Sequence, residues 1–353
     1  MKAVKLSSLL VVFGVAGCLS EAGDVSEGPS HLGARELSYR QVDVTAGPVG
    51  FNGWSPAGVS DKGEVYGLGF TCDEFYYNCQ FDLIKRRVDG TFATVRENFS
   101  PSEVNGNGDV GGCTVDDNAT LFGQAAIVRA NGQLDLIPKL PGEVTSCVNQ
   151  LSDNRAVVVT SFDSAYTATT YVLDRNRNTP FTGGAAAIRD LNDDGQLAGI
   201  STADVDAQRA FRFDSRTETT TILDPVSPDP HSWGMAINKH GEVLGYSFIF
   251  SATERIGKWT RNNEFQTLFV EGTPELPTVS NNLMWNEDGL IVVSQTTDLN
   301  TYLIPAPGVR VNLQDLVGNA TVPTTLIGLD INKGGDFVAF SIDDFTTQLY
   351  LRD

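Results

Sequence analysis

The sequence predicts an all-β protein built as a ring of seven four-stranded blades, and three observations carry that prediction. The 353 residues include 35 glycines and no long stretch with helical periodicity, which favours many short strands joined by turns. One segment recurs seven times along the chain. The two ends of the sequence also supply complementary parts of a single blade.

The recurring segment reads apolar, Asn or Ser, two variable residues, Gly, one variable residue and a second apolar residue. We call its first apolar residue the anchor; the seven anchors are Val59, Val104, Leu151, Leu191, Ile237, Trp285 and Ile331, spaced 45, 47, 40, 46, 48 and 46 residues apart. This pattern predicts a β-hairpin, because Asn or Ser presets a type I turn and Gly takes the left-handed conformation that completes it.

Two further strand-like runs follow each hairpin; in the fifth copy they span 256–260 and 264–270. Four strands in each of seven units of this length indicate a seven-bladed β-propeller. An open β-solenoid is the structural alternative, although its repeats are normally shorter.

The third copy departs from the rule, because Arg155 stands where the other copies have Gly. We expect that either Asn154 takes the left-handed conformation or the turn differs there.

The last copy has three strands, at about 325–332, 336–341 and 348–352, and the sequence then stops. Residues 38–45 alternate in polarity and precede the first copy, so they can supply the missing outer strand. We expect them to pair with 348–352, which closes the ring and removes an exposed sheet edge.

The first residues have the form of an export signal, with Lys2 and Lys5 before a short apolar run over 6–15. Val15-Ala16-Gly17-Cys18 resembles the lipobox of bacterial lipoproteins, although an ordinary signal peptide cut elsewhere is the alternative. The resemblance implies a signal peptide over 1–17, acyl chains such as palmitate on Cys18, and a protein facing the periplasm or the cell exterior. Residues 18–36 then form a flexible tether, and 37–353 form one propeller domain.

Composition restricts the partners. With 44 Asp and Glu against 25 Lys and Arg, the net charge is −19, which excludes nucleic acid as a partner. For the same reason we expect contact with a membrane only through the lipid anchor. We expect the domain to be monomeric.

Met235-Ala236-Ile237-Asn238-Lys239-His240-Gly241-Glu242-Val243-Leu244-Gly245 resembles the repeat of the HAF family of probable extracellular bacterial repeats, with its Ile-Asn-x-x-Gly-x-Val-x-Gly core. Arg209-Ala210-Phe211-Arg212-Phe213 partly matches the family's second element, but the histidine that names the family is absent. The resemblance covers part of each copy over 50–353. It implies an exported propeller-like domain and brings no catalytic residues.

Four cysteines remain once Cys18 is assigned to lipid, and an exported chain is expected to pair them. Cys72 and Cys79 close a short aromatic loop in the first blade, which leaves Cys113 and Cys147 to join the second blade to the third. The absence of a Cys-x-x-Cys spacing disfavours a metal site.

The position before each anchor should form a ring around the axis, and three of its members are acidic: Glu103, Asp190 and Asp330. If they face the channel, they could bind a cation or a polyhydroxylated ligand at its mouth. The structural alternative is that they are solvated or accept hydrogen bonds from the backbone of a neighbouring blade.

Asp190-Leu191-Asn192-Asp193-Asp194-Gly195 matches the first half of a calcium loop, which makes Asp190, Asn192 and Asp194 the calcium candidates. However, Ser201 stands where such a loop needs a bidentate Glu, and the turn rule already explains Asn192 and Gly195. We expect no other cofactor.

The sequence contains no nucleophile elbow, His-Glu-x-x-His helix, phosphate loop or dinucleotide fingerprint. Of three histidines, only His231 has a place suited to a binding face, and Trp54, Trp233 and Phe75-Tyr76-Tyr77 could form an aromatic rim or pack the blades. The sequence favours a lipid-anchored module that binds a protein or glycan over an enzyme. The alternatives are a surface hydrolase or lyase acting on carbohydrate or peptide through channel carboxylates, and a passive envelope part.

Overall fold

The structure is a computed structural model, and it describes residues 37–72, 79–115, 123–175, 177–181, 186–201, 208–249, 253–271, 283–286, 289–294, 300–323 and 326–353. The chain divides into two compact units, Met1–Arg35 and Glu36–Asp353, and the description concerns the second. The expected signal peptide, Cys18 and tether, and the Phe75-Tyr76-Tyr77 loop, lie outside the described residues.

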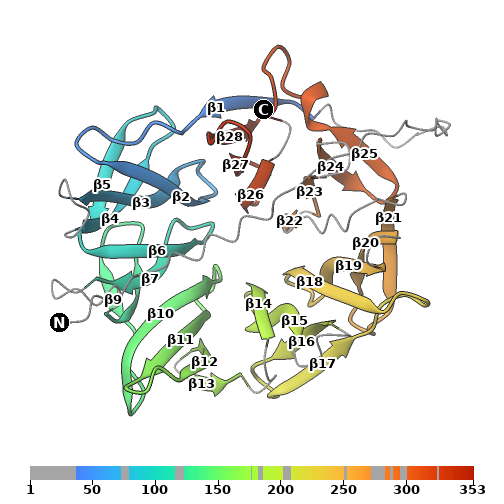
Figure 1. Cartoon of the computed structure of the whole chain (residues 1–353), viewed down its shortest axis with the longest axis horizontal. Coiled ribbons are helices and arrows are strands. Elements are labelled where there is room, and N and C mark those ends of the chain that lie inside the picture. The colour runs from blue at the N-terminus through green and yellow to red at the C-terminus, as the bar shows by residue number, and fades with distance from the viewer. Residues whose placement is uncertain are drawn as a thin grey trace, which may run out of the picture. The chain divides into compact units, whose positions relative to one another are not determined.

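Seven four-stranded antiparallel sheets form a ring in the second unit (Figure 1), which confirms the prediction of a seven-bladed propeller. Blades are numbered along the chain, and the strands of each are given from the axis outward. Blade 1 contains β2 (Gly53–Val59), β3 (Val65–Cys72), β4 (Cys79–Arg86) and β5 (Phe92–Arg96). Blade 2 contains β6 (Phe99–Val104), β7 (Val110–Thr114), β8 (Ala125–Val128) and β9 (Leu134–Leu136). Blade 3 contains β10 (Glu143–Leu151), β11 (Val157–Asp163), β12 (Ala168–Asp174) and β13 (Arg177–Pro180).

Blade 4 contains β14 (Ala186–Leu191), β15 (Gln196–Ser201), β16 (Arg209–Asp214) and β17 (Thr219–Leu223). Blade 5 contains β18 (His231–Ile237), β19 (Val243–Ile249), β20 (Thr253–Trp259) and β21 (Phe265–Glu271). Blade 6 contains β22 (Leu283–Trp285), β23 (Ile291–Ser294), β24 (Thr301–Ala306) and β25 (Val309–Asn312), followed by a short 3-10 helix, η1 (Leu313–Asp315).

Blade 7 closes the ring with strands from both ends of the chain. It contains β26 (Leu326–Ile331), β27 (Phe337–Ser341), β28 (Thr347–Arg352) and, outermost, β1 (Tyr39–Asp43). β1 pairs antiparallel with β28 in the register Tyr39↔Arg352 to Asp43↔Gln348, as predicted. The Tyr39 side chain is only 3% exposed and packs edge-on against Phe337, so this strand also contributes to the core.

The turn joining the first two strands has the same form in every blade. The glycine at its closing position has a positive φ in six blades: Gly63, Gly108, Gly195, Gly241, Gly289 and Gly335. In blade 3, Arg155 itself takes this conformation, with φ 67°, and its N–H donates to the carbonyl of Ser152 as the glycines do in the other turns. Neither expectation for this copy was right, because the turn is unchanged and Asn154 does not carry the positive φ.

The apolar residue two places after each of these positions is buried in all seven blades: Val65, Val110, Val157, Leu197, Val243, Ile291 and Phe337. Hydrophobic clusters extend between adjacent blades; one joins Val158 and Val172 of blade 3 to Leu197 and Phe213 of blade 4. The repeated apolar positions thus form the core that holds the blades together. In the described part of the chain, no helix has the length and apolarity needed to cross a membrane.

Candidate functional site: the axial pocket

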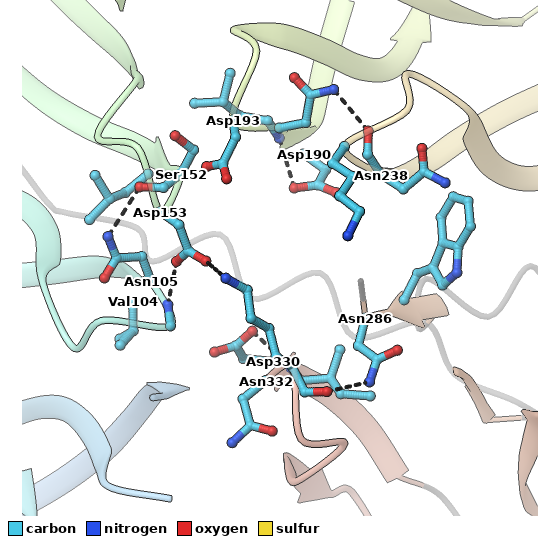
Figure 2. A pocket seen from close by; sticks show the side chains of 18 of the residues that line it. Val104, Asn105, Ser152, Asp153, Asp190, Asp193, Asn238, Asn286, Asp330 and Asn332 are labelled. Carbon is cyan, nitrogen blue, oxygen red and sulfur yellow. Dashed lines mark hydrogen bonds and ion pairs between the residues drawn. The ribbon is translucent and has the colours of Figure 1, made fainter. Parts of the chain in front are cut away.

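The seven turns converge on a pocket of about 150 Å³, which we call the axial pocket (Figure 2). Residues from all seven blades line it; they include the seven anchors and the polar residues that follow them: Asp61, Asn105, Ser152, Asp153, Asn192, Asp193, Asn238, Lys239, Asn286, Asn332 and Lys333. The pocket exists because the same turn occurs once in each blade and points to one axis.

The Asn after the anchor holds its own turn and the next blade together. In blade 2, Asn105 Oδ1 accepts the N–H of Asp109 at 2.9 Å, while its Nδ2 donates to the carbonyl of Ser152 in blade 3 at 3.1 Å. Asn192, Asn286 and Asn332 likewise accept from their own turns and donate to the next blade. Four Asn side chains thus link blade 2 to 3, 4 to 5, 6 to 7 and 7 to 1 around the rim of the pocket.

Two of the three predicted ring carboxylates accept hydrogen bonds from the backbone of a neighbouring blade, which was the structural alternative to ligand binding. Asp330 Oδ2 accepts the N–H of Val59 in blade 1 at 2.8 Å, and Asp190 Oδ2 accepts the N–H of Ile237 in blade 5 at 2.7 Å. The second oxygen of each accepts the N–H of the residue that follows it. A β-bulge precedes each carboxylate, at Leu329 and Arg189 respectively, and bends the inner strand at this point.

The ring carboxyls lie close enough for the charges of Asp190 and Asp330 to raise the pKa of Glu103, and for that of Asp190 to raise the pKa of Asp330. Burial raises the pKa of Glu103 well above its usual range, and the charges of Asp330 and Asp190 raise it further. Burial raises the pKa of Asp190 to about 6 and that of Asp330 to about 7, although backbone N–H groups oppose both shifts. All three side chains are half-buried; Asp190 and Asp330 line the axial pocket, and Glu103 lies outside its lining. The ring thus favours protonated carboxyls.

An ion pair spans the outer part of the pocket. Lys333 Nζ of blade 7 lies 2.5 Å from Asp153 Oδ2 of blade 3, although these blades are not neighbours (Figure 2). Asp153 Oδ1 also accepts the N–H of Gly106, and Asp61 Oδ1 accepts the N–H of Lys333. Sequence reasoning missed this pair, although aligning the seven copies places Asp61, Asp153, Asp193, Lys239 and Lys333 at one position, two after the anchor.

The calcium candidates are adjacent, but each has another partner. Asn192 Oδ1 accepts the N–H groups of Asp194 and Gln196, and Asp194 Oδ1 lies 3.0 Å from the Arg216 guanidinium. Within the described ranges, no group of three or more acidic, His or Cys side chains is arranged to hold a metal ion. A calcium site at Asp190, Asn192 and Asp194 stays a prediction.

The structure contains the disulfides Cys72–Cys79 and Cys113–Cys147. Cys113 lies in β7 of blade 2 and Cys147 in β10 of blade 3, so the second disulfide joins adjacent blades. Neither lies in the axial pocket.

The remaining candidates are structural. His231 is 7% exposed and stacks on Phe248, and Trp233 packs edge-on against the same ring. Trp54 Nε1 donates to the carbonyl of Val44, so this indole holds the segment between β1 and blade 1 in place.

A buried network that the sequence did not reveal fixes the loop between β17 and β18. Asp229 accepts from Ser247 Oγ at 2.7 Å and pairs with the Arg255 guanidinium at 2.5 Å. Since Asp229 is 6% exposed, the pair compensates a charge that would otherwise be buried alone.

The fold and site together define a β-propeller with a polar axial pocket, and comparison with known proteins adds the fold alone. No family model matches the sequence, and no curated protein matches it, so the resemblance to the HAF repeats stays a prediction.

Virginiamycin B lyase from Staphylococcus aureus, solved with quinupristin, is similar in structure, with a TM-score of 0.51 and 12% identity over 89% of this chain and 99% of that one. The β-propeller domain of the Trilobed protease from Pyrococcus furiosus, which has an open velcro topology, gives a TM-score of 0.57 and 8% identity over 86% of this chain and 97% of that one.

Proposed function

We propose that the protein is an exported binding module, anchored to a bacterial membrane by lipid on Cys18, that holds its ligand in the axial pocket. The observation that carries the proposal is the convergence of seven hydrogen-bonded turns on one polar pocket. A pocket whose walls are fixed before binding loses little conformational entropy when a ligand enters.

A surface hydrolase or lyase is the second candidate, favoured by the mutually interacting carboxyls Glu103, Asp190 and Asp330. Raised pKa values suit general acid catalysis, and burial raises those of Asp190 and Asp330 to about 6 and about 7. Against it, both oxygens of Asp190 and of Asp330 accept backbone N–H groups, which holds these carboxyls as parts of the scaffold.

Ligand binding is tested by thermal shift of the full chain against glycans and peptides. A ligand at a hundred times its Kd adds about 2.7 kcal/mol and raises the melting temperature. Lys239→Trp places a large side chain over the pocket and should abolish the shift. The control is Lys62→Trp, an exposed position on the blade 1 turn that does not line the pocket. A shift that survives Lys239→Trp would place the ligand elsewhere.

The anchor is tested separately by expressing the full chain in bacteria with labelled palmitate. Wild type should incorporate label and fractionate with membranes, whereas Cys18→Ser should do neither. Label retained by Cys18→Ser would contradict the lipid attachment while leaving the pocket proposal intact.

A further inference from the structure

The acceptors of the axial pocket already have donors. Asp61, Asp153 and Asp193 each accept a backbone N–H from another blade, and Asp153 also pairs with Lys333. Two further lining carboxylates, Asp190 and Asp330, each accept two backbone N–H groups. The side-chain oxygens of Asn105, Asn192, Asn238, Asn286 and Asn332 accept N–H groups of their own turns.

Among the described lining residues, two donor groups have no partner, and they lie on neighbouring blades. Lys239 Nζ, in the blade 5 turn, has no ion-pair or hydrogen-bond partner in the described part of the chain. Trp285, the blade 6 anchor, lines the same pocket, and its Nε1 likewise has no partner among the described residues. Trp285 is also the one aromatic residue among seven anchors that are otherwise Val, Leu or Ile.

We propose that the axial pocket binds a carboxylate-bearing sugar, a uronic acid residue, whose carboxylate pairs with Lys239 and whose ring lies against Trp285. This inference rests on the proposed binding function and names its ligand class. A charge-assisted hydrogen bond to a carboxylate is among the strongest that an otherwise solvated lysine can form. An aromatic side chain offers an apolar face to the sugar ring.

The size and charge of the pocket favour one sugar residue over a longer segment. About 150 Å³ corresponds to roughly five water molecules, which suits a single ring entering from solvent. The net charge of −19 opposes a long polyanion, so the terminal residue of a chain fits better than its interior.

The acidic side chains in and beside the pocket repel the carboxylate of the ligand less than their number suggests. Burial and mutual repulsion raise the pKa of Glu103, and burial raises that of Asp330 to about 7, so protonated forms persist near neutral pH. The charge of Asp153 is matched by Lys333. Among the described residues of this rim, Lys239 is the cation with no acidic partner, so we assign the incoming anion to it.

The test compares two ligands that differ only in the charged group. Trigalacturonic acid carries a carboxylate where neutral galactotriose carries a hydroxymethyl group, and calorimetry on the full chain gives Kd for each. We expect wild type to bind trigalacturonic acid at least about tenfold more tightly than galactotriose. Lys239→Gln should weaken binding of the acid about tenfold and leave galactotriose unchanged.

Matched variants separate this site from general electrostatics. Lys62→Gln removes the same charge from the same kind of turn, outside the pocket, and should leave both affinities within about twofold of wild type. Trp285→Leu should weaken both ligands, since it removes the surface they share.

Equal wild-type affinity for the two sugars, or no binding of either, would overturn the ligand class. An unchanged affinity for the acid in Lys239→Gln would overturn the residue assignment. Tighter binding of a triaspartate peptide than of either sugar would replace the saccharide with an acidic peptide. None of these results decides whether the pocket binds any ligand, because the thermal-shift experiment with Lys239→Trp tests that separately. Failure of the ligand class can therefore be distinguished from failure of the binding function.

Discussion

The carboxylate of Asp330 accepts the backbone N–H of Val59 at 2.8 Å, across 271 residues of sequence. This contact joins blade 7 to blade 1 beside the axis, whereas β1 and β28 join the ends of the chain at the circumference. Asp190 makes the same contact between blades 4 and 5. Two side chains that the sequence suggested as ligand groups therefore hold the inner strands of adjacent blades together.

The first prediction concerns stability against pH. A carboxyl whose folded-state pKa lies above its unfolded value contributes stability below about pH 4, and that contribution is lost as pH rises through the folded pKa. For Asp190 the loss begins near pH 4 and is complete above about pH 6, and for Asp330 it is complete above about pH 7. Glu103→Gln removes one charge from the ring and should raise the melting temperature at pH 8 while changing it little at pH 5.

The control for this experiment is Glu97→Gln, an exposed position outside the ring. Scanning fluorimetry between pH 5 and 8.5 provides the measurement. If the melting temperatures of wild type and Glu103→Gln differ by a constant amount from pH 5 to 8.5, the three carboxyls do not interact.

The second prediction concerns ring closure. Tyr39→Ala should lower the free energy of unfolding by about 3 kcal/mol or more, because it leaves a cavity beside Phe337. Deletion of 37–46 should destabilise the whole domain further, since it removes β1 entirely. Urea denaturation measures both, and an unchanged midpoint for the deletion would mean that β1 does not close the ring in solution.

The third prediction separates two roles of Arg155. Its side chain pairs with the buried Asp109 at 2.9 Å, but its backbone has a φ of 67°. Arg155→Gly loses the ion pair and relieves the backbone, whereas Arg155→Ala loses the pair and keeps the unfavourable conformation. Arg155→Ala should therefore be less stable than Arg155→Gly by about 1 kcal/mol, as measured by chemical denaturation. Equal stabilities would argue against the left-handed turn.

The fourth prediction ranks the disulfides. Cys113 and Cys147 are 34 residues apart and Cys72 and Cys79 only 7, so the chain-entropy estimate is about 4 kcal/mol for the first and about 2 kcal/mol for the second. Replacing Cys113 and Cys147 together with Ala should lower the melting temperature more than replacing the other pair. The reverse order would indicate that strand pairing already restrains blades 2 and 3 in the unfolded chain.

The blades could be predicted because their signals are local and repeated seven times. The Asn and Gly of each turn and the flanking apolar residues are consequences of one hairpin geometry, and β1 was found because the last copy lacked a strand. Even the exception at Arg155 was visible, although its ion pair with Asp109 in the neighbouring blade was not.

The site was less predictable because its contacts join blades far apart in sequence. Glu103, Asp190 and Asp330 were found from their common position in the repeat, and the structure brings them together. Spacing in the sequence does not determine whether a carboxylate faces a ligand or a backbone N–H of the neighbouring blade. The Lys333–Asp153 pair depends on which blades face each other across the axis.

The order in which the blades can form follows from the pairing of β1 with β28. Blades 1 to 6 each consist of consecutive strands, so each can pair its own strands once its segment is available and then pack against its neighbour. Blade 7 forms only when Tyr39 pairs with Arg352. Its outer strand, β1, therefore stays unpaired until more than 300 further residues have been synthesised. During that interval β1 is an unpaired strand with a buried-type tyrosine exposed, which makes it the segment of the nascent domain most in need of protection from aggregation.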